Sequence, residues 1–121
     1  MVGATPVNYQ WSFFLASLDP TTGSEQAGKR PVIVISREQT NQRLSVVNVV
    51  PLTSRKSPSR IIYPNEVLLL ASPAGIQVDS IALCYQIRTL DKHRLERQLG
   101  TLTDEHLRRA ILEALRFQLE I

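Results

Sequence analysis

Residues 23–36 of this chain read GSEQAGKRPVIVIS, a polar loop bounded by glycines that leads through Lys29, Arg30 and Pro31 into an apolar run. Glycine accepts backbone angles that other residues resist, and proline fixes φ where the run begins. The β-branched residues that follow are typical of a buried strand. The stretch therefore predicts a flexible loop that delivers a fixed cationic pair to the mouth of a core strand, where it can meet an anionic substrate.

Short apolar segments recur on both sides of this stretch and predict further strands. The expected strands are 13–18, 31–36, 45–52, 66–71, 79–84 and 86–90, with single helical turns within 37–44 and 91–97. An amphipathic helix is expected from Thr103, its N-cap, to the end of the chain, with Asp104 and Glu105 at its positive end. Many short strands and one closing helix predict an α+β, mainly β fold: a small, strongly bent, SH3-like β-barrel with a C-terminal helix.

The length and charge of the chain limit its class. With 121 residues and 43% hydrophobic content, residues 1–121 are expected to form a single small domain. The net charge is only +3, but residues 29–60 hold seven Lys and Arg against one Glu. This basic middle third suits a polyanion or an acidic protein segment as partner. Arg37 and Arg43 are more simply interpreted as part of a solvated face.

Several kinds of site are not expected. The single cysteine, Cys84, cannot form an intrachain disulfide, and its apolar neighbours predict that it is buried. The carboxylates are scattered, so neither a metal site nor a cofactor is expected. The apolar runs are too short to span a membrane and no leader pattern is visible, so a cytoplasmic protein is expected. His93 and His106 are expected on the surface, which argues against a ribonuclease that uses paired histidines.

Several blocks of sequence occur together in a fixed order: LDP at 18–20, GSEQAGKRP at 23–31, PLTS at 51–54, DSIAL at 79–83, QIRTLDK at 86–92 and LGTL at 99–102. In these blocks the chain resembles the MazF/PemK family of toxin endoribonucleases. Two places depart from the family pattern. Trp11 and Ser12 stand where the family usually has Gly followed by an acidic residue, and Tyr85 replaces a usual acidic residue.

The resemblance implies the toxin of a type II toxin–antitoxin system. Such a toxin is a metal-independent, sequence-specific endoribonuclease that cleaves single-stranded mRNA through attack by the 2′-hydroxyl of the RNA. The resemblance places the catalytic residues at Arg30 and Thr53. A guanidinium stays protonated and forks onto phosphate oxygens, so Arg30 suits transition-state stabilisation and not general base catalysis. Thr53 can bind a phosphate oxygen or relay a proton; without the resemblance it would be interpreted as a strand-end residue that caps its own backbone.

Further polar residues of the matching blocks are candidates for substrate contact. They are Ser24, Glu25, Gln26, Lys29, Asn41, Ser54, Arg55 and Gln86. Glu25 can orient Arg30, contact a base edge, or be a solvated loop charge. Gln86 can bond a base or the loop backbone, or be a satisfied buried amide.

The resemblance also implies the partners. They are a second copy of the chain in a symmetric homodimer, single-stranded RNA as substrate, and a cognate acidic antitoxin that covers the basic stretch. Operator DNA would be contacted only through the antitoxin complex, and no membrane partner is implied. Two alternatives stay open. One is a gyrase-poisoning toxin of the same fold, against which stands the absence of Trp in residues 117–121. The other is a catalytically degenerate protein that only binds antitoxin.

Overall fold

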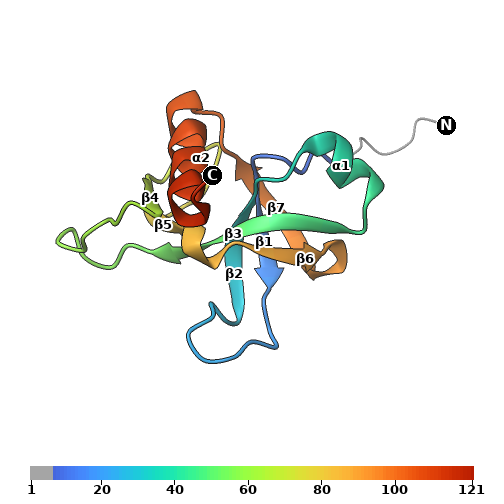
Figure 1. The fold of residues 1–121 in the computed structure, drawn as a ribbon, viewed down its shortest axis with the longest axis horizontal. Helices are drawn as coiled ribbons and strands as arrows, with labels where there is room; N and C mark the ends of the chain where they lie inside the picture. Colours follow the sequence, from blue (N-terminus) through green and yellow to red (C-terminus); the bar gives the residue numbers. More distant parts are fainter. Residues whose placement is uncertain (1–6) are drawn as a thin grey trace.

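Seven strands form one bent, wholly antiparallel sheet in the computed structural model of the protein, which describes residues 7–121 (Figure 1). The strands are β1 (Ser12–Ser17), β2 (Lys29–Val34), β3 (Val46–Ser54), β4 (Glu66–Leu69), β5 (Ser80–Leu83), β6 (Arg88–Asp91) and β7 (Leu95–Thr101). The helices are α1 (Glu38–Arg43) and α2 (Glu105–Leu119), with the short 3-10 turns η1 (Cys84–Gln86) and η2 (Lys92–Arg94). The expected α+β, mainly β architecture with a C-terminal helix is confirmed.

The strands do not close into a barrel. Their order is β4-β5-β3-β2-β1-β7, and β6 pairs with the first half of β3. β5 pairs with the second half of β3, so the turn η1 bends the chain between two segments that share one strand edge. Within residues 7–121 no pairing joins β7 back to β4 or β6. The predicted barrel is therefore seen as a bent sheet that stays open at β4 and β7. No helix in this part of the chain has the length and apolar content that a membrane crossing needs.

Alternate residues of the central strands face two separate apolar clusters. Ile33 of β2 and Val50 of β3 join the cluster on which α2 packs with Ile111. Val32 and Val49 join a second cluster on the other side of the sheet. Because side chains alternate along a strand, even-numbered residues of β2 and odd-numbered residues of β3 face away from α2.

Several bounds differ by a few residues from the sequence-based expectation; β2, for example, begins at Lys29 and not at residue 31, and β4 ends at Leu69 and not at residue 71. Two further differences change an element or its cap. Only Lys92–Arg94 of the expected helical turn at 91–97 is helical, and Leu95–Thr101 forms the edge strand β7 beside β1. The sequence LERQLGT lacks alternating apolar residues because this strand lies at the edge of the sheet and is half exposed. The N-cap of α2 is Asp104, not Thr103, because its carboxylate accepts the backbone N–H groups of His106 and Leu107 at 2.8 and 3.2 Å.

Trp11 has a left-handed backbone conformation, with φ of 65°, directly before β1. Its N–H donates to the carbonyl of Val34 at 2.7 Å, and its own carbonyl accepts the N–H of Leu102 at 2.8 Å. The guanidinium of Arg108 on α2 lies 5.5 Å from the centroid of its ring. Backbone bonds on both sides and packing against α2 therefore hold the residue in a conformation that is unfavourable for a bulky side chain.

A buried ion pair fastens the loop between β3 and β4. The Glu66 side chain is 3% exposed and accepts both terminal nitrogens of Arg60, at 2.6 and 2.8 Å. It also accepts the backbone N–H of Tyr63 at 3.0 Å. Hydrogen bonding to Arg60 lowers the pKa of the Glu66 carboxyl, against the desolvation that would raise it. The carboxylate thus ties the loop to the first residue of β4.

We expect protonation of Glu66 to destabilise the protein in acid. In the unfolded chain the glutamate has its ordinary pKa of 4.5, whereas the folded chain protonates it only at lower pH. The stabilisation is therefore complete above the unfolded pKa and disappears as the pH falls through the lowered folded pKa. Glu66→Gln should cost about 1.5–3 kcal/mol at neutral pH, the size of a hydrogen bond to a charged group.

Urea unfolding of the wild-type protein and of Glu66→Gln between pH 3 and 7 measures this effect. As the pH falls, the free energy of unfolding of Glu66→Gln should decrease less steeply than that of the wild-type protein. Glu113→Gln, an exposed change on α2, is the matched control and should keep the wild-type decline. An equally steep decline in Glu66→Gln would contradict the assignment.

Candidate functional site

The strand register brings Arg30 and Thr53 together. Val32 of β2 pairs with Pro51 of β3, and continuing this antiparallel register by two residues places Arg30 opposite Thr53. Arg30 is an even-numbered residue of β2 and Thr53 an odd-numbered residue of β3, so both face away from α2. Both line one pocket of about 470 Å³, whose other polar side chains come from Lys29, Ser54 and Ser80. We call it the Arg30 pocket.

The guanidinium of Arg30 is oriented by a single tether. Its Nε donates to the carbonyl of Ala27 at 2.9 Å, and the side chain is half-buried. Its two terminal nitrogens have no hydrogen-bond partner among residues 7–121. They form the outer edge of the guanidinium, which is the edge that binds two oxygens of a phosphate or carboxylate.

Gln86 clamps the loop between β1 and β2 to the sheet. Its Oε1 accepts the N–H of Gln26 at 3.2 Å, and its Nε2 donates to the carbonyl of Ser24 at 3.0 Å. Of the alternatives left open by the sequence, the structure therefore shows the bond to the loop backbone. The loop is also closed at its base, where the carboxylate of Asp19 accepts the N–H of Gly28 at 3.1 Å.

A second pocket lies on the other side of the same loop. It measures about 530 Å³ and is lined by Ser24, Glu25, Gln26, Pro51, Tyr85, Gln86, Ile87 and Arg88. We call it the Tyr85 pocket. Residues 24–26 line this pocket and residues 27–29 line the Arg30 pocket, so the loop is a wall common to both. The structure thus brings most of the predicted substrate-contacting residues to two adjacent pockets.

Two acidic contacts in this region are local. The carboxylate of Glu25 accepts the N–H of Thr22 at 2.6 Å, which caps a turn within the loop. It therefore does not orient Arg30. The Nζ of Lys29 lies 3.1 Å from a carboxylate oxygen of Glu96 on β7. Because the Lys29 side chain is 64% exposed, its charge remains accessible at the rim of the Arg30 pocket.

Asn41 and Arg55 are not brought to either pocket. Asn41 is 1% exposed on α1, and its Nδ2 donates to the carbonyl of Ser36 at 2.8 Å, which fixes α1 to the end of β2. Arg55 donates through one terminal nitrogen to the carbonyls of Pro58 and Arg60 at 2.7 and 3.3 Å, inside the loop after β3. The contacts of both side chains are structural.

Sequence reasoning missed two arginines that support the loop. Arg88 donates to the carbonyl of Leu18 at 3.2 Å, and Arg94 donates to the carbonyl of Ser17 at the same distance. They fix the point where β1 ends and the loop begins. Arg88 lies in the matching block at 86–92, but nothing in the sequence distinguishes an arginine that binds backbone carbonyls from one that binds substrate.

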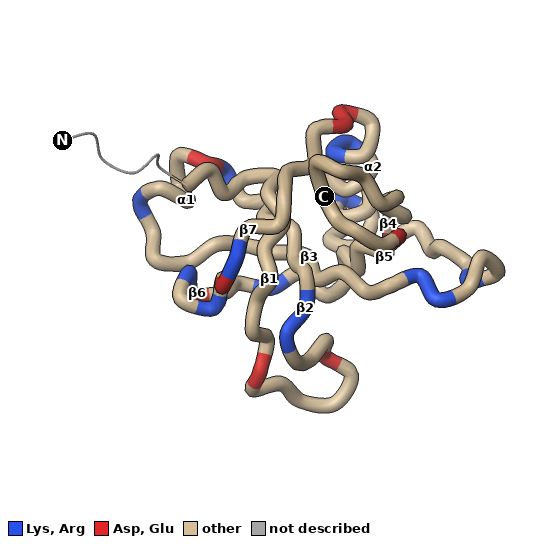
Figure 2. Tube along the Cα trace, turned by 180° about the vertical axis from the view of Figure 1, so that it is seen from behind, with Lys and Arg blue, Asp and Glu red and all other residues tan. Residues whose placement is uncertain are grey.

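The basic residues between 29 and 60 do not form one continuous face. Figure 2 shows them in separate places: at the start of β2, in the loop after β3, and around α1. Arg55 and Arg60 are moreover engaged by groups of their own loop. Of the cations in this stretch, Lys29 and Arg30 are the two that line either pocket. The cations of the basic middle third are therefore divided among three places.

A family model described as "PemK-like, MazF-like toxin of type II toxin-antitoxin system" matches residues 9–119. The chain is also 39% identical over 95 residues to Endoribonuclease MazF of Staphylococcus saprophyticus, which covers 78% of each protein. The chain belongs to the MazF/PemK toxin family.

Solved structures of MazF-like proteins share the fold. MazF from Deinococcus radiodurans superposes with a TM-score of 0.78 at 25% identity, covering 97% of this chain and all of that one. A mycobacterial endoribonuclease solved in complex with its cognate antitoxin gives a TM-score of 0.73 at 22% identity, covering 97% of both chains. The expected family is thus confirmed, and this protein is a MazF-like toxin and a homologue of endoribonuclease MazF.

Other reactive side chains of this MazF-like toxin lie outside the two pockets. The His93 side chain is fully exposed, with Nδ1 2.9 Å from Asp91, and His106 is exposed on α2. Burial raises the pKa of Cys84 to about 12, and the nearby Glu66 adds to the shift, so the thiol is not a nucleophile at neutral pH. In residues 7–121 no three His, Cys, Asp or Glu side chains are grouped as a metal site requires.

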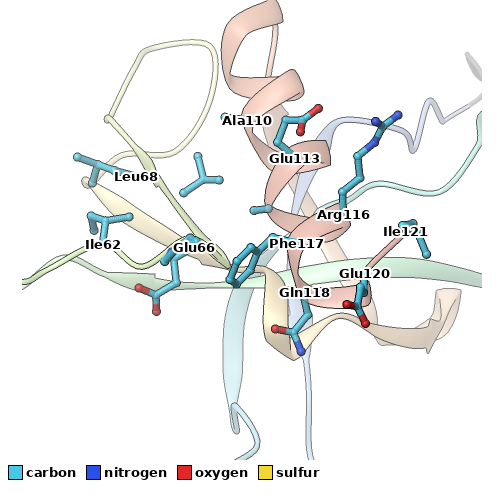
Figure 3. A pocket seen from close by; sticks show the side chains of 13 residues that line it. Ile62, Glu66, Leu68, Ala110, Glu113, Arg116, Phe117, Gln118, Glu120 and Ile121 are labelled. Carbon is cyan, nitrogen blue, oxygen red and sulfur yellow. The ribbon is translucent and has the colours of Figure 1, made fainter.

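A hollow of about 1240 Å³ lies between the C-terminal half of α2 and β4. Figure 3 shows Phe117 and Ile121 on one side of it and Ile62 and Leu68 on the other. Phe117 is 63% and Ile121 83% exposed. Large apolar side chains at such exposure are typical of a surface that a protein partner covers.

Proposed function

We propose that this toxin cleaves single-stranded mRNA at specific sequences without a metal, by attack of a 2′-hydroxyl on the adjacent phosphorus. The observation that supports the proposal is the tethered guanidinium of Arg30 beside Thr53 in the Arg30 pocket. Its free edge matches two non-bridging phosphate oxygens, and it would bind most strongly when charge builds up in the pentavalent transition state. Catalysis then comes from charge that is fixed in place before the substrate arrives.

In the proposed reaction, a bond forms between the 2′-oxygen and phosphorus, and the bond from phosphorus to the 5′-oxygen breaks. The 2′-hydroxyl loses its proton, and the leaving 5′-oxygen gains one. The products carry a 2′,3′-cyclic phosphate and a 5′-hydroxyl. Thr53 binds a phosphate oxygen or relays a proton, while Arg30 stabilises the phosphorane-like state and can donate to the leaving oxygen.

The remaining residues of the pockets would hold the RNA on either side of the cleaved phosphate. Lys29 and Ser54 line the Arg30 pocket, where they would contact the sugar–phosphate backbone. Ser24, Glu25, Gln26 and Gln86 line the Tyr85 pocket, where they would surround a neighbouring nucleotide. Residues 1–121 would act as one toxin domain in the cytoplasm, where mRNA is available.

We further propose that the toxin is a symmetric homodimer controlled by an acidic antitoxin. The open edge strand β4 and the exposed apolar side chains beside it support an isologous contact with a second copy. The cations Lys29 and Arg30 support an antitoxin whose carboxylates occupy the place of RNA phosphates, with operator DNA bound only through that complex. Native mass spectrometry at micromolar concentration tests the dimer, and a monomeric mass would contradict it.

Digestion of a long RNA in EDTA tests the proposed reaction. We expect unchanged cleavage, new 5′-hydroxyl ends, and cyclic or 3′-phosphate on the other ends, all read by end-specific ligation. RNA carrying 2′-O-methyl groups at the mapped cut sites is the matched control and should resist, because its nucleophile is blocked. Cleavage that stops in EDTA and returns with magnesium would refute the metal-independent mechanism.

A further inference from the structure

We infer that the Tyr85 pocket binds one nucleobase of the RNA, and that the ring of Tyr85 is the surface on which this base stacks. The inference rests on the proposed RNA cleavage and assigns a role to a residue that differs from the family pattern. Tyr85 lies in the turn η1, directly before the loop clamp Gln86. It is 42% exposed although it lines a pocket, so its ring is open to a ligand.

The position of the pocket relative to Arg30 determines which base can enter. Pro51 lines the Tyr85 pocket and Thr53 lines the Arg30 pocket. Side chains two residues apart on a strand point to the same face. Pro51 and Thr53 therefore lie about 7 Å apart on the floor of the site. The pockets are therefore adjacent, and a nucleotide next to the cleaved phosphate can place its base in the Tyr85 pocket.

The surroundings of Tyr85 favour a flat, partly polar ligand. The pocket that Tyr85 lines is also lined by the loop residues 24–26, Gln86 and Arg88, so polar and charged residues adjoin the tyrosine. Bases of single-stranded RNA are unstacked and bind in this way to aromatic side chains. A tyrosine ring has few rotatable bonds and loses little freedom on binding.

The loop clamp keeps this platform close to the reacting centre. Gln86 holds the backbone of residues 24 and 26, and the carbonyl of Ala27 orients the Arg30 guanidinium. Gln86, the neighbour of Tyr85, and Arg30 are thus both bonded to the backbone of one loop. A base stacked on Tyr85 would help to place its attached phosphate at Arg30, which predicts an effect on substrate affinity for one nucleotide position only.

Steady-state cleavage of a set of short RNAs tests this inference. One RNA of the set is complete. Each of the others has the same cut site and lacks a single base, either next to the cut or farther from it. On the complete RNA, Tyr85→Ala should lower kcat/KM by about 5- to 150-fold, the range of one base–aromatic stack, mainly through KM. Tyr85→Phe should retain most of the activity. Tyr63→Ala, a change of another exposed tyrosine outside both pockets, is the control and should be neutral.

The abasic RNAs separate stacking from a general disturbance of the loop. At one position adjoining the cut, removal of the base should abolish the difference in kcat/KM between the wild-type protein and Tyr85→Ala. An equal loss for Tyr85→Ala on every RNA, or no loss on the complete RNA, would overturn the inference. Failure of the proposed function gives a different result, since the wild-type protein would then cleave none of the RNAs.

Discussion

Arg30→Ala should lower kcat for RNA cleavage by about 10²–10³-fold, the usual effect of removing one preorganised group that stabilises charge in a transition state. The guanidinium is held by its Nε on the carbonyl of Ala27, and its outer edge is free at the pocket. It therefore does not have to reorient when negative charge develops on the phosphate. Single-turnover cleavage of a defined RNA measures the loss directly.

Arg30→Lys should restore only part of the activity, because an ammonium cannot bind two oxygens through parallel N–H groups and has no Nε to keep the tether. Arg43→Ala, which removes an exposed arginine from α1, is the matched control and should cleave normally. Circular dichroism should be unchanged in all three variants. A folded Arg30→Ala protein with near-normal kcat would disprove the assigned role.

Thr53→Val should reduce kcat by roughly 10²-fold, at the lower end of the range for lost proton transfer. Valine is β-branched and strand-favouring like threonine but lacks the hydroxyl group, so the loss isolates that group. Thr53 is half-buried near the end of β3, beside Ser54 in the Arg30 pocket. Thr53→Ser should recover most of the rate if the hydroxyl acts on phosphate.

The same RNA and single-turnover conditions serve for the threonine variants. Thr40→Val, an exposed change on α1, is the control. Thermal unfolding should show that Thr53→Val is as stable as the wild type. The opposite pattern, normal cleavage with reduced stability, would show that Thr53 only caps the strand end, which is the interpretation of the residue without the family resemblance.

The buried strands could be predicted from the sequence because their signal is local. The run from Val32 to Val34 is apolar and β-branched, and it forms the second half of the central strand β2, next to β3. The strand β7 could not be predicted, because it lies at the sheet edge and has polar, half-exposed side chains. Its pairing with β1 joins segments about eighty residues apart and is interrupted by register shifts. Local periodicity in the sequence carries no information on the long-range pairing of β7 or on its register shifts.

The sequence predicted most of the polar residues that line the two pockets of the candidate site, but not the contacts that they make. The resemblance marked Arg30 and Thr53, and the strand register brings them to one pocket. The bonds of Gln86 to the loop span 60 and 62 residues, so no local pattern could choose between the base and the backbone. Asn41 shows the reverse case, since its polar side chain fits a binding role but is buried against Ser36.

The backbone at Trp11 has a consequence for what glycine would do at this position. An L-residue in the left-handed region costs roughly 1–2 kcal/mol more than glycine there. The indole offsets this cost, because it packs against the core and lies under the guanidinium of Arg108. Trp11→Gly would therefore release the backbone strain and lose the packing of the indole together, so the two changes in the free energy of unfolding oppose each other.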